Sequence, residues 1–583
     1  MKTKLILHQT HHTLADFDGI FEYAAAHLKG DGLHLFPELF LCGYPLQDLV
    51  LQKPFIDEYE GHLQELENWA KKQPSANWRG LLGGLAYHRE DGQYPKKITN
   101  VIYEVIPGVG IKTLYTKRLL PNYDIFDEQK YFSAGHENAF YTFNGETFGL
   151  QICEDMWAST FHEIDPCILM FEEVQKKNLK LSGVINLSAS PFEVSKSHKR
   201  ADRAKQISLL FKCPFVYINR VGGEDEVLFD GRSFVTEAGT IPLELKSFSQ
   251  DIGEYVVSLE GNYQETPVFI EDNTWEGLFR PQLDTSKKPY QMNRWSQEDC
   301  EIVFKALTFG LQEYATKSGF KKFLIALSGG MDSALVLALT KLSLKPGQSV
   351  EAIYMPSVFS SPVSTALSED MCRRIGIPMS YLPIKFLHST VKNTFTQTFL
   401  EPFSGLTDEN VQSRLRGALL YTRSNQTGAM VINTSNKSEL AVGYSTQYGD
   451  SVGAISLLGD LYKTEVYELS RYINAHHGNI IPEGIIDRGP SAELRENQLD
   501  QDSLPPYERL DPMLEGILSY RLGKKELLEA GFSEQEVTKV LHLYLKSEYK
   551  RAQFCPIIKI KAKSFGFGYR MPMTKNLDYQ LNH

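Results

Sequence analysis

Cysteine is scarce in this sequence, and its placement excludes two kinds of site. Only seven cysteines occur among 583 residues, and none lies in the Cys-x-x-Cys spacing that is typical of structural zinc. A small, odd number also argues against the disulfide framework of a secreted protein. We therefore expect a protein of a reducing compartment, the cytoplasm, without structural zinc.

Two further features are missing, namely an excess of basic residues and a long apolar run. Lys and Arg number 61 against 72 Asp and Glu, which gives a net charge of −11. Because nucleic-acid binding needs a basic face, we expect no nucleic-acid partner. The N-terminus has only a three-residue apolar run before polar residues, and no later run is long enough to span a bilayer. The sequence thus predicts neither a signal peptide nor a membrane partner.

The length exceeds what one hydrophobic core supports and favours about two to four domains. Short apolar runs alternate with helical patterns in both halves, which is typical of layered α/β folds. Residues 262–296 are weakly periodic and contain Pro267, Pro281 and Pro289. We predict one domain at residues 1–265, a linker at 266–294 and a second domain at 295–583.

A glycine-containing turn, the run SGGMDS at residues 328–333, joins a predicted strand at 323–327 to a predicted helix beginning at 334. Glycine lets the backbone bend and approach a ligand closely, and a helix start favours an anion. The spacing is not that of the Walker loop. It resembles the pyrophosphate loop of ATP pyrophosphatases. An ordinary turn with Ser333 as helix cap is the alternative, but the added Asp332 and Ser333 favour nucleotide binding.

In the first half, three reactive side chains follow predicted strands: Glu38, Lys117 and Cys153. A thiol attacks an amide carbonyl when a base takes its proton and a cation stabilises the oxyanion. These residues supply those three roles. Taken singly, Glu38 also suits a helix cap, Lys117 a surface charge and Cys153 a small buried side chain. Strands are predicted at residues 4–7, 33–36, 80–86, 100–105, 147–152, 183–187 and 215–218, and a helix at 19–28.

Four segments of this half resemble the nitrilase family: FPEL (36–39), LYTKRLLPNY (114–123), GLQICEDMW (149–157) and NLSASPF (186–192). The resemblance implies an α-β-β-α sandwich in which Glu38, Lys117 and Cys153 form a triad that hydrolyses carbon–nitrogen bonds. In glutaminase members of the family, the positions that match Tyr123, Ser190 and Lys196 bind glutamine.

In the second half, strands predicted at 350–355 and 379–384 add to the strand before the SGGMDS turn and indicate a doubly wound parallel sheet. Ser357 follows one strand end, where such sheets contact adenine and ribose, although a simple turn is the alternative. Asn410 and Arg414 lie one turn apart on a polar helix. That spacing suits a phosphate-bearing substrate, and a solvated helix face explains it equally.

Further runs resemble NAD synthetases: VINTSNKSEL (431–440), GYSTQYGD (443–450), LGDLYKT (458–464) and the basic C-terminal segment 559–572. The resemblance implies a Rossmann-like ATP pyrophosphatase domain with Asp332 and Glu439 as Mg²⁺ ligands. The implied ATP-binding residues are Ser328, Gly329, Gly330, Asp332, Ser333, Ser357 and Thr434. Those implied for deamido-NAD⁺ are Asn410, Arg414, Glu439, Asp450, Lys463 and Lys559.

Both halves together resemble glutamine-dependent NAD synthetases over nearly the whole chain. The resemblance implies that glutamine is hydrolysed to ammonia, which an internal channel delivers. It also implies that ATP with Mg²⁺ adenylates deamido-NAD⁺, which ammonia converts to NAD⁺ with release of AMP and pyrophosphate. Residues 491–507 are expected to cover the loaded site, and a homo-oligomer, at least a dimer through the synthetase domain, is implied.

Two alternatives remain at this point. One is another ATP-pyrophosphatase amidotransferase, which the GYSTQYGD run disfavours. The other is a nucleotide-sensing protein without catalysis, which the complete set formed by Glu38, Lys117, Cys153, Asp332 and Glu439 disfavours.

Overall fold

The computed structural model describes residues 2–90, 94–157, 162–194, 196–257, 263, 283–284, 286–496 and 498–576. The chain forms two compact units, Met1–Phe279 and Arg280–His583. The predicted linker lies largely outside the described residues, so the domain limits given above stay a prediction. Among the described helices, none is both long and apolar enough to cross a membrane.

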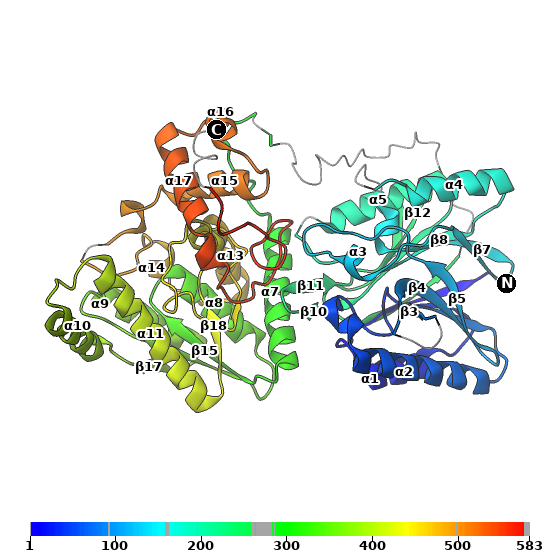
Figure 1. Ribbon diagram of the computed structural model, residues 1–583, viewed down its shortest axis with the longest axis horizontal. Coiled ribbons are helices and arrows are strands. Elements are labelled where there is room, and N and C mark those ends of the chain that lie inside the picture. The colour runs from blue at the N-terminus through cyan, green and yellow to red at the C-terminus, as the bar shows by residue number, and fades with distance from the viewer. Residues whose placement is uncertain are drawn as a thin grey trace. The chain divides into compact units, whose positions relative to one another are not determined.

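The first unit contains two six-stranded sheets (Figure 1). One has the order β14 (Asp251–Val256), β1 (Lys4–Gln9), β2 (Gly32–Leu35), β3 (Trp78–His88), β4 (Lys97–Ile106) and β5 (Gly110–Thr116). The other has the order β13 (Thr240–Glu244), β12 (Phe234–Glu237), β9 (Phe215–Asn219), β8 (Gly183–Ser188), β7 (Glu146–Ile152) and β6 (Ala139–Phe143). In each sheet three central strands are parallel and the outer pairs are antiparallel.

The two sheets pack face to face, and helices cover their outer faces. Leu81 on β3 and Val216 on β9 belong to the core between the sheets. Their chain neighbours Leu82 and Phe215 point the other way and pack under helices, as the alternation of side chains along a strand requires. The helices α1 (Phe17–His27) and α2 (Lys53–Lys72) cover the first sheet, and α4 (Pro166–Lys177) and α5 (Lys196–Phe211) cover the second (Figure 1). The predicted α-β-β-α sandwich is confirmed.

The second unit is built on a five-stranded parallel sheet with the order β17 (Met379–Tyr381), β16 (Ser349–Tyr354), β15 (Lys322–Leu327), β18 (Met430–Asn433) and β19 (Ile455–Ser456). The strand order reverses between β15 and β18. At such a switch point the crevice beyond the carboxyl ends of the strands is the usual ligand site. The doubly wound sheet is confirmed, although β17 ends three residues earlier than predicted, shortly before Pro383, which has no N–H to donate to a strand neighbour.

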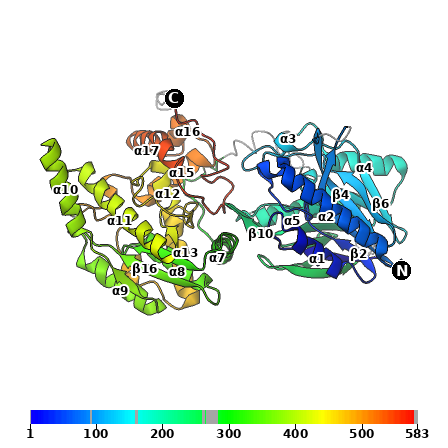
Figure 2. The same cartoon turned by 60° about the horizontal axis from the view of Figure 1, so that its bottom comes forward.

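Helices cover both faces of this sheet. On one face, α8 (Met331–Ser343) packs on β15 and contacts α7 (Gln297–Lys317) and α13 (Lys463–His477). On the other, α11 (Leu406–Thr427) packs on β15 and β18, with α10 (Lys385–Phe399) beside it (Figure 2). The remaining helices are α9 (Pro362–Ile375), α12 (Lys437–Val442), α14 (Glu483–Ile486), α15 (Tyr507–Leu518), α16 (Lys524–Glu529), α17 (Glu534–Lys546) and α18 (Glu548–Arg551).

Candidate active sites

Cys153 lies at a sharp turn directly after β7. Its φ of 42° is in the left-handed region, which is uncommon for a residue with a side chain, and it starts the short 3-10 helix Cys153–Met156. The Asp155 carboxylate holds this turn because it accepts hydrogen bonds from the N–H groups of Ile152 at 3.0 Å and Leu119 at 2.8 Å, and from the Tyr115 hydroxyl at 2.8 Å. The strand end and the carboxylate together fix the position of the thiol.

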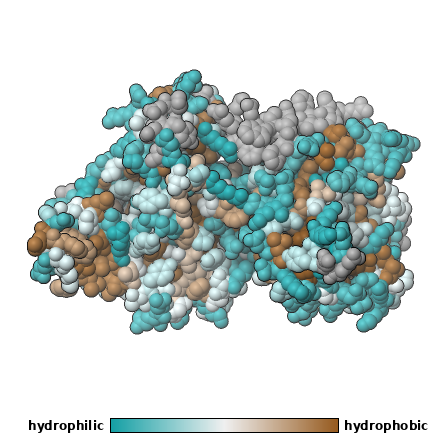
Figure 3. Space-filling model, viewed as in Figure 1, coloured by the Kyte–Doolittle hydropathy of each residue, from teal (hydrophilic) through white to brown (hydrophobic). Residues whose placement is uncertain are grey.

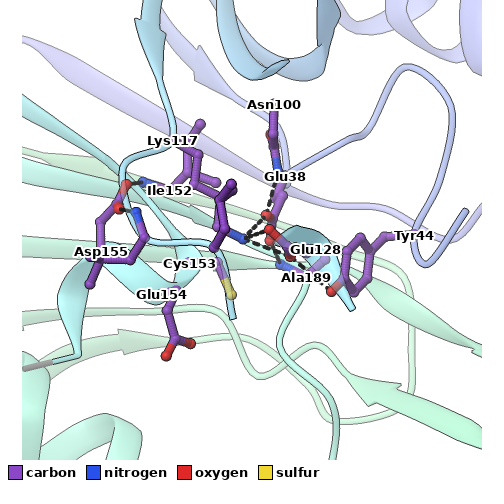
Figure 4. Close-up of polar contacts among 12 residues, drawn as sticks. Glu38, Tyr44, Asn100, Lys117, Glu128, Ile152, Cys153, Glu154, Asp155 and Ala189 are labelled. Carbon is purple, nitrogen blue, oxygen red and sulfur yellow. Dashed lines mark hydrogen bonds and ion pairs between the residues drawn. The ribbon is translucent and has the colours of Figure 1, made fainter. Parts of the chain in front are cut away.

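The Lys117 ammonium lies between two buried carboxylates (Figure 4). It donates to Glu38 Oε1 at 2.7 Å and to Glu128 at 2.8 Å. The second Glu38 oxygen accepts from the Ala189 N–H at 2.9 Å, and Asn100 Nδ2 donates to Oε1 at 2.7 Å. The Glu38 carboxylate thus accepts hydrogen bonds from three donors. Glu38, Lys117 and Cys153, predicted from three separate strand ends, are brought together (Figure 4).

The electrostatics of this site keep the thiol protonated and the lysine charged. Burial, followed by the charge of Glu38, raises the pKa of Cys153 well above its usual value. Burial alone lowers the pKa of Lys117, but the charges of Glu128 and Glu38 outweigh it and the pKa lies well above its usual value. Burial also raises the pKa of Glu128 to about 7, although Lys117 acts in the opposite direction. Because the resting thiol is neutral, attack requires a base that takes the proton as the bond forms.

The residues predicted to bind glutamine lie in the same unit. The Tyr123 hydroxyl donates to Glu154, the residue after the nucleophile, at 3.0 Å. The Ser190 N–H donates to Asn219 Oδ1 at 2.8 Å. The Lys196 ammonium lies 6.0 Å from the ring centre of Phe126. Burial and then the charge of Arg200 lower the pKa of Lys196, whereas the charges of Cys153 and Glu154 favour its cation.

In the second unit, the SGGMDS turn connects β15 to α8 through backbone that only glycine adopts easily. Gly329 has a φ of +79°, and a Cβ there would lie 2.6 Å from the carbonyl oxygen of Ser364. The hydroxyls of the turn bond to each other, with Ser328 Oγ 3.0 Å from Ser333 Oγ. The helix cap is Gly330, with α8 starting at Met331, so the alternative of a turn capped by Ser333 is wrong.

A cavity of about 250 Å³ lies at the switch point between β15 and β18. It is lined by nine of the predicted residues, namely Ser328, Gly329, Gly330, Asp332, Ser333, Thr434, Glu439, Asp450 and Lys463. Arg416 also lines it, as does Asp500 from the segment 491–507 that is expected to cover the site. Burial lowers the pKa of Arg416 to about 10 and raises the pKa of Asp500.

Opposite charges meet on the floor of this cavity. Lys463 Nζ contacts Asp332 directly and lies 3.7 Å from Glu439 Oε1. Asn436 Nδ2 donates to Asp332 Oδ1 at 3.0 Å. Burial, and then the negative charge of Asp332, raise the pKa of Glu439 well above its usual value. Two carboxylates and an ammonium therefore stand beside a glycine turn suited to phosphate.

Comparison with known proteins agrees with this two-site arrangement. Residues 10–249 match the carbon–nitrogen hydrolase family and residues 303–554 match the NAD synthase family. The glutamine-dependent NAD(+) synthetase of Synechocystis sp. is 35% identical over 558 residues, which cover 94% of each chain. The Aquifex aeolicus protein of the same name is 33% identical over 593 residues, 98% of this chain and 99% of that one. The chain belongs to the glutamine-dependent NAD(+) synthetase family.

A solved structure of a glutamine-dependent NAD⁺ synthetase from Acinetobacter baumannii, in complex with ADP, matches 98% of both chains with a TM-score of 0.70 and 29% identity. The Cytophaga hutchinsonii structure, at 19% identity and a TM-score of 0.75, shares the fold. The protein is therefore a two-domain enzyme of this synthetase family, a carbon–nitrogen ligase with a glutaminase domain. The alternatives of a non-catalytic sensor and of another amidotransferase are not supported.

Four predicted synthetase residues lie outside the lining of the cavity, and their roles stay predictions. Ser357 Oγ accepts from the N–H of Phe359 at 3.1 Å. Asn410 Oδ1 accepts from the Thr446 hydroxyl at 2.7 Å, and Arg414 Nε donates to the Gln447 carbonyl at 3.3 Å. The buried Lys559 ammonium donates to the carbonyls of Lys561 at 2.6 Å and Ala562 at 2.9 Å.

Two residues of the glutaminase site, Glu128 and Asn100, were not assigned a role from the sequence. Glu128, which bridges Lys117 and the Tyr44 hydroxyl, lies on the single-turn helix α3 (Glu128–Tyr131). Its segment, FDEQKYF, has the composition of a solvated turn. Asn100, a donor to Glu38, is a polar residue within the apolar strand β4. A buried polar side chain in a largely buried strand is a signal that could have identified it.

Proposed function

We propose that the first unit hydrolyses glutamine and that the second uses the ammonia to convert deamido-NAD⁺ to NAD⁺. Two observations support the proposal. In the first unit, Glu38, Lys117 and Cys153 lie together and are buried. In the second unit, the glycine turn at residues 328–330 lines a cavity next to the charged groups of Asp332, Glu439 and Lys463. One site releases ammonia, and the other activates a carboxylate with ATP.

In the glutaminase step, Glu38 takes the proton of Cys153 while the sulfur attacks the side-chain amide carbon of glutamine. The carbonyl oxygen becomes an oxyanion, and the Lys117 ammonium, kept charged by its carboxylate neighbours, stabilises it. Glu38 then gives its proton to the leaving nitrogen, and ammonia departs. Water, deprotonated by Glu38, hydrolyses the thioester to glutamate and restores the thiol.

The substrate roles of Tyr123, Ser190 and Lys196 rest on the resemblance and on their location near Cys153. Glutamine has an α-carboxylate, and the half-buried Lys196 has an ammonium that the charges of Glu193, Cys153 and Glu154 favour. We assign Lys196 to that carboxylate, because an ammonium attracts a carboxylate of opposite charge.

In the synthetase step, the N–H groups of the Ser328–Gly330 turn and the start of α8 hold the phosphates of ATP. The nicotinate carboxylate of deamido-NAD⁺ attacks the α-phosphorus, and pyrophosphate leaves. Lys463 neutralises negative charge as the adenylate forms. Ammonia attacks the acyl carbon, AMP leaves with the C–O electron pair, and a proton is lost from nitrogen to give the amide of NAD⁺.

The carboxylates of Asp332 and Glu439 fit a Mg²⁺ site. Mg²⁺ is commonly held by one or two carboxylates, with phosphate oxygens and water completing the shell. The two carboxylates share one ammonium, Lys463, and burial raises the pKa of Glu439, so a divalent cation matches the donor set. No group of three or more metal-binding His, Cys, Asp or Glu side chains occurs in the described part of the chain. When bound, Mg²⁺ would neutralise part of the negative charge of the ATP triphosphate.

A dimer through the second unit is part of the proposal. The helix α10 buries only His388 of its side chains. Phe386 is 78% exposed and Phe399 is 61% exposed, and Leu400, just after the helix, is 86% exposed. Figure 3 shows an apolar patch over α10. A patch of large apolar side chains is typical of a protein contact, and a two-fold dimer would place the same face of a second copy against it.

Cytoplasmic location and ammonia channelling also remain proposals. None of the seven cysteines forms a disulfide, which fits a reducing compartment. A channel is expected because only the neutral form of ammonia is nucleophilic and most of it is protonated in bulk water near neutral pH. Measuring ammonia that escapes during glutamine-driven turnover tests this expectation.

The decisive test compares wild type with Cys153→Ala, using glutamine or ammonium as the nitrogen donor for NAD⁺ formation from deamido-NAD⁺, ATP and Mg²⁺. We expect the variant to lose the glutamine-driven reaction and to keep the ammonium-driven one. If the wild type forms no NAD⁺ from either donor, the synthetase proposal is wrong. If Cys153→Ala still uses glutamine, the assignment of the nucleophile is wrong.

A further inference from the structure

Lys463 is the first residue of α13, so the start of this helix determines where its ammonium lies. The N-cap residue is Tyr462, which is not one of the short polar residues that usually cap a helix. The first N–H groups of a helix have no partner within the helix, and a buried N–H without a partner costs free energy. Because Tyr462 and Lys463 are both buried, we looked for these partners on other elements.

Two side chains from other helices accept the N–H groups at this start. Ser438 Oγ, on α12, accepts from the Lys463 N–H at 2.9 Å. Asp511 Oδ2, on α15, accepts from the Thr464 N–H at 2.9 Å. The Ser438 hydroxyl in turn donates to Asp511 Oδ1 at 2.6 Å. Both side chains are fully buried, so these hydrogen bonds are shielded from solvent.

The same serine lies beside a second charged group of the cavity. Glu439 follows Ser438 in the first turn of α12. Asn436, the N-cap residue of that helix, donates to Asp332 Oδ1 at 3.0 Å. The Ser438 hydroxyl therefore joins the helix that carries Glu439 to the helix that carries Lys463. Ser438 does not itself line the cavity, so it acts on the site through these two helices.

The ion pairs of Lys463 cannot be what holds its position during the reaction. Its ammonium contacts Asp332 and lies 3.7 Å from Glu439 Oε1. Phosphate groups that enter the cavity compete for the ammonium, and a contact that is given up no longer fixes the residue. The backbone of Lys463 is held independently of its charge, by the Ser438 hydroxyl. This anchor matters because a displacement of about 1 Å can cost about 100-fold in rate.

We propose that Ser438 and Asp511 are positioning residues of the second unit, which fix the starts of α12 and α13 so that the Lys463 ammonium meets the phosphates of ATP. The Asp511 carboxylate supplies the negative charge that a helix start favours. It also takes the proton of the Ser438 hydroxyl as a hydrogen bond, which leaves the lone pairs of that oxygen for the Lys463 N–H. The proposal rests on the proposed synthetase function and adds two residues outside the cavity to it.

The experiment measures kcat and the KM for ATP in ammonium-driven NAD⁺ formation from deamido-NAD⁺, ATP and Mg²⁺. The variants are Ser438→Ala, Asp511→Asn and the double variant. Ser470→Ala is the matched control, because Ser470 is fully buried on α13 and donates to the Val466 carbonyl of the same helix at 2.7 Å. Glutamine hydrolysis, measured for each variant, verifies that the first unit is intact.

We expect Ser438→Ala and Asp511→Asn each to lower kcat about 10–100-fold, since hydrogen bonds that involve a charged group are worth that much. The KM for ATP should change by less than about threefold, because Lys463 acts on charge that develops as the adenylate forms. The double variant should lose less than about threefold beyond the larger single loss, because the two residues act as one unit. Ser470→Ala should keep at least about half of the wild-type kcat.

Three results would overturn the proposal. The first is wild-type kcat in Ser438→Ala. The second is a rise in KM for ATP that matches the fall in kcat, or loss of ATP binding, since either shows a general loss of structure. The third is a double variant whose loss is the product of the two single losses. A failure of the synthetase function itself would appear separately, as wild type that forms no NAD⁺ from ammonium.

Discussion

Lys117 is a buried ammonium that forms ion pairs with two buried carboxylates. Replacing it with methionine tests how much these ion pairs contribute to the stability of the first unit and to catalysis. Its ammonium is 2.7 Å from Glu38 and 2.8 Å from Glu128, and all three side chains are at most 4% exposed. Methionine keeps much of the volume of the stem and removes the charge. Glu38 then retains Asn100 and the Ala189 N–H, whereas Glu128 retains the Tyr44 hydroxyl.

The expected loss of stability is large and depends on pH. Removing one partner of a buried ion pair costs about 3–5 kcal/mol. Even with Lys117 present, the pKa of Glu128 is raised from 4.5 to about 7, which corresponds to about 3 kcal/mol of lost stability once both folded and unfolded forms are ionised. A carboxyl group with a raised pKa binds its proton more tightly in the folded state, so stability falls as pH rises from 4.5 through 7. Without Lys117 this loss extends to higher pH.

We expect Lys117→Met to lose the glutamine-driven reaction by at least about 10³-fold, because the oxyanion loses its cation. Hydrogen exchange with mass spectrometry, read on peptides of the first unit, should show weaker protection at about pH 8 than at about pH 5.5. Peptides of the second unit and ammonium-driven NAD⁺ formation are internal controls.

The double variant Lys117→Met with Glu128→Gln separates stability from catalysis. It should regain most of the protection, since one buried charge is gone, without regaining glutaminase activity. Wild-type protection of Lys117→Met at the higher pH would refute the electrostatic reasoning. Retained glutamine-driven activity would refute the oxyanion role of Lys117.

Three predictions concern the second unit. Gly329→Ala should lower ammonium-driven NAD⁺ formation at least about 100-fold, because its Cβ would lie 2.6 Å from a carbonyl oxygen at a φ of +79°. Gly330→Ala is the control, with its nearest atom at 3.2 Å, and equal losses in both would contradict the argument. Glu439→Gln should raise the Mg²⁺ concentration for half-maximal synthetase activity about tenfold or more while glutamine hydrolysis stays unchanged; an unaltered Mg²⁺ titration would remove Glu439 from the metal site. Phe386→Glu together with Phe399→Glu should lower the mass measured by sedimentation, whereas an unchanged mass would exclude α10 as the subunit contact.

The parts of the fold that were predicted correctly share one physical property. The central strands of all three large sheets are buried on both faces, so they appear in the sequence as short continuous apolar runs. Cys153 directly follows β7 and Glu38 lies three residues after β2, which made both recognisable as polar residues close to strand ends. The outer strands β5, β6, β12, β13 and β14 of the first unit were not predicted. In β13 exposed and half-buried residues alternate, so little distinguishes it from a loop.

The missing site residues were hidden for a different reason. Glu128 lies only eleven positions after Lys117, yet nothing in the intervening sequence indicates that its carboxylate turns back to the ammonium. His162 reaches Glu154 from a stretch without regular periodicity. Contacts of this kind depend on how loops return over a sheet, and no local pattern of residues encodes them. The glycine turn was predictable because its function restricts residue type at consecutive positions.

The protonated state of the Cys153 thiol affects how readily this residue is oxidised. Peroxides and alkylating agents react with thiolates, and burial keeps this thiol neutral until a substrate amide and Glu38 draw off its proton. The Cys153 thiol is therefore less reactive toward oxidants when no substrate is bound. Of the seven cysteines, Cys555 is the one that is half-buried rather than buried. Oxidation should therefore occur first at Cys555, in the second unit. The glutaminase site should still release ammonia at that stage.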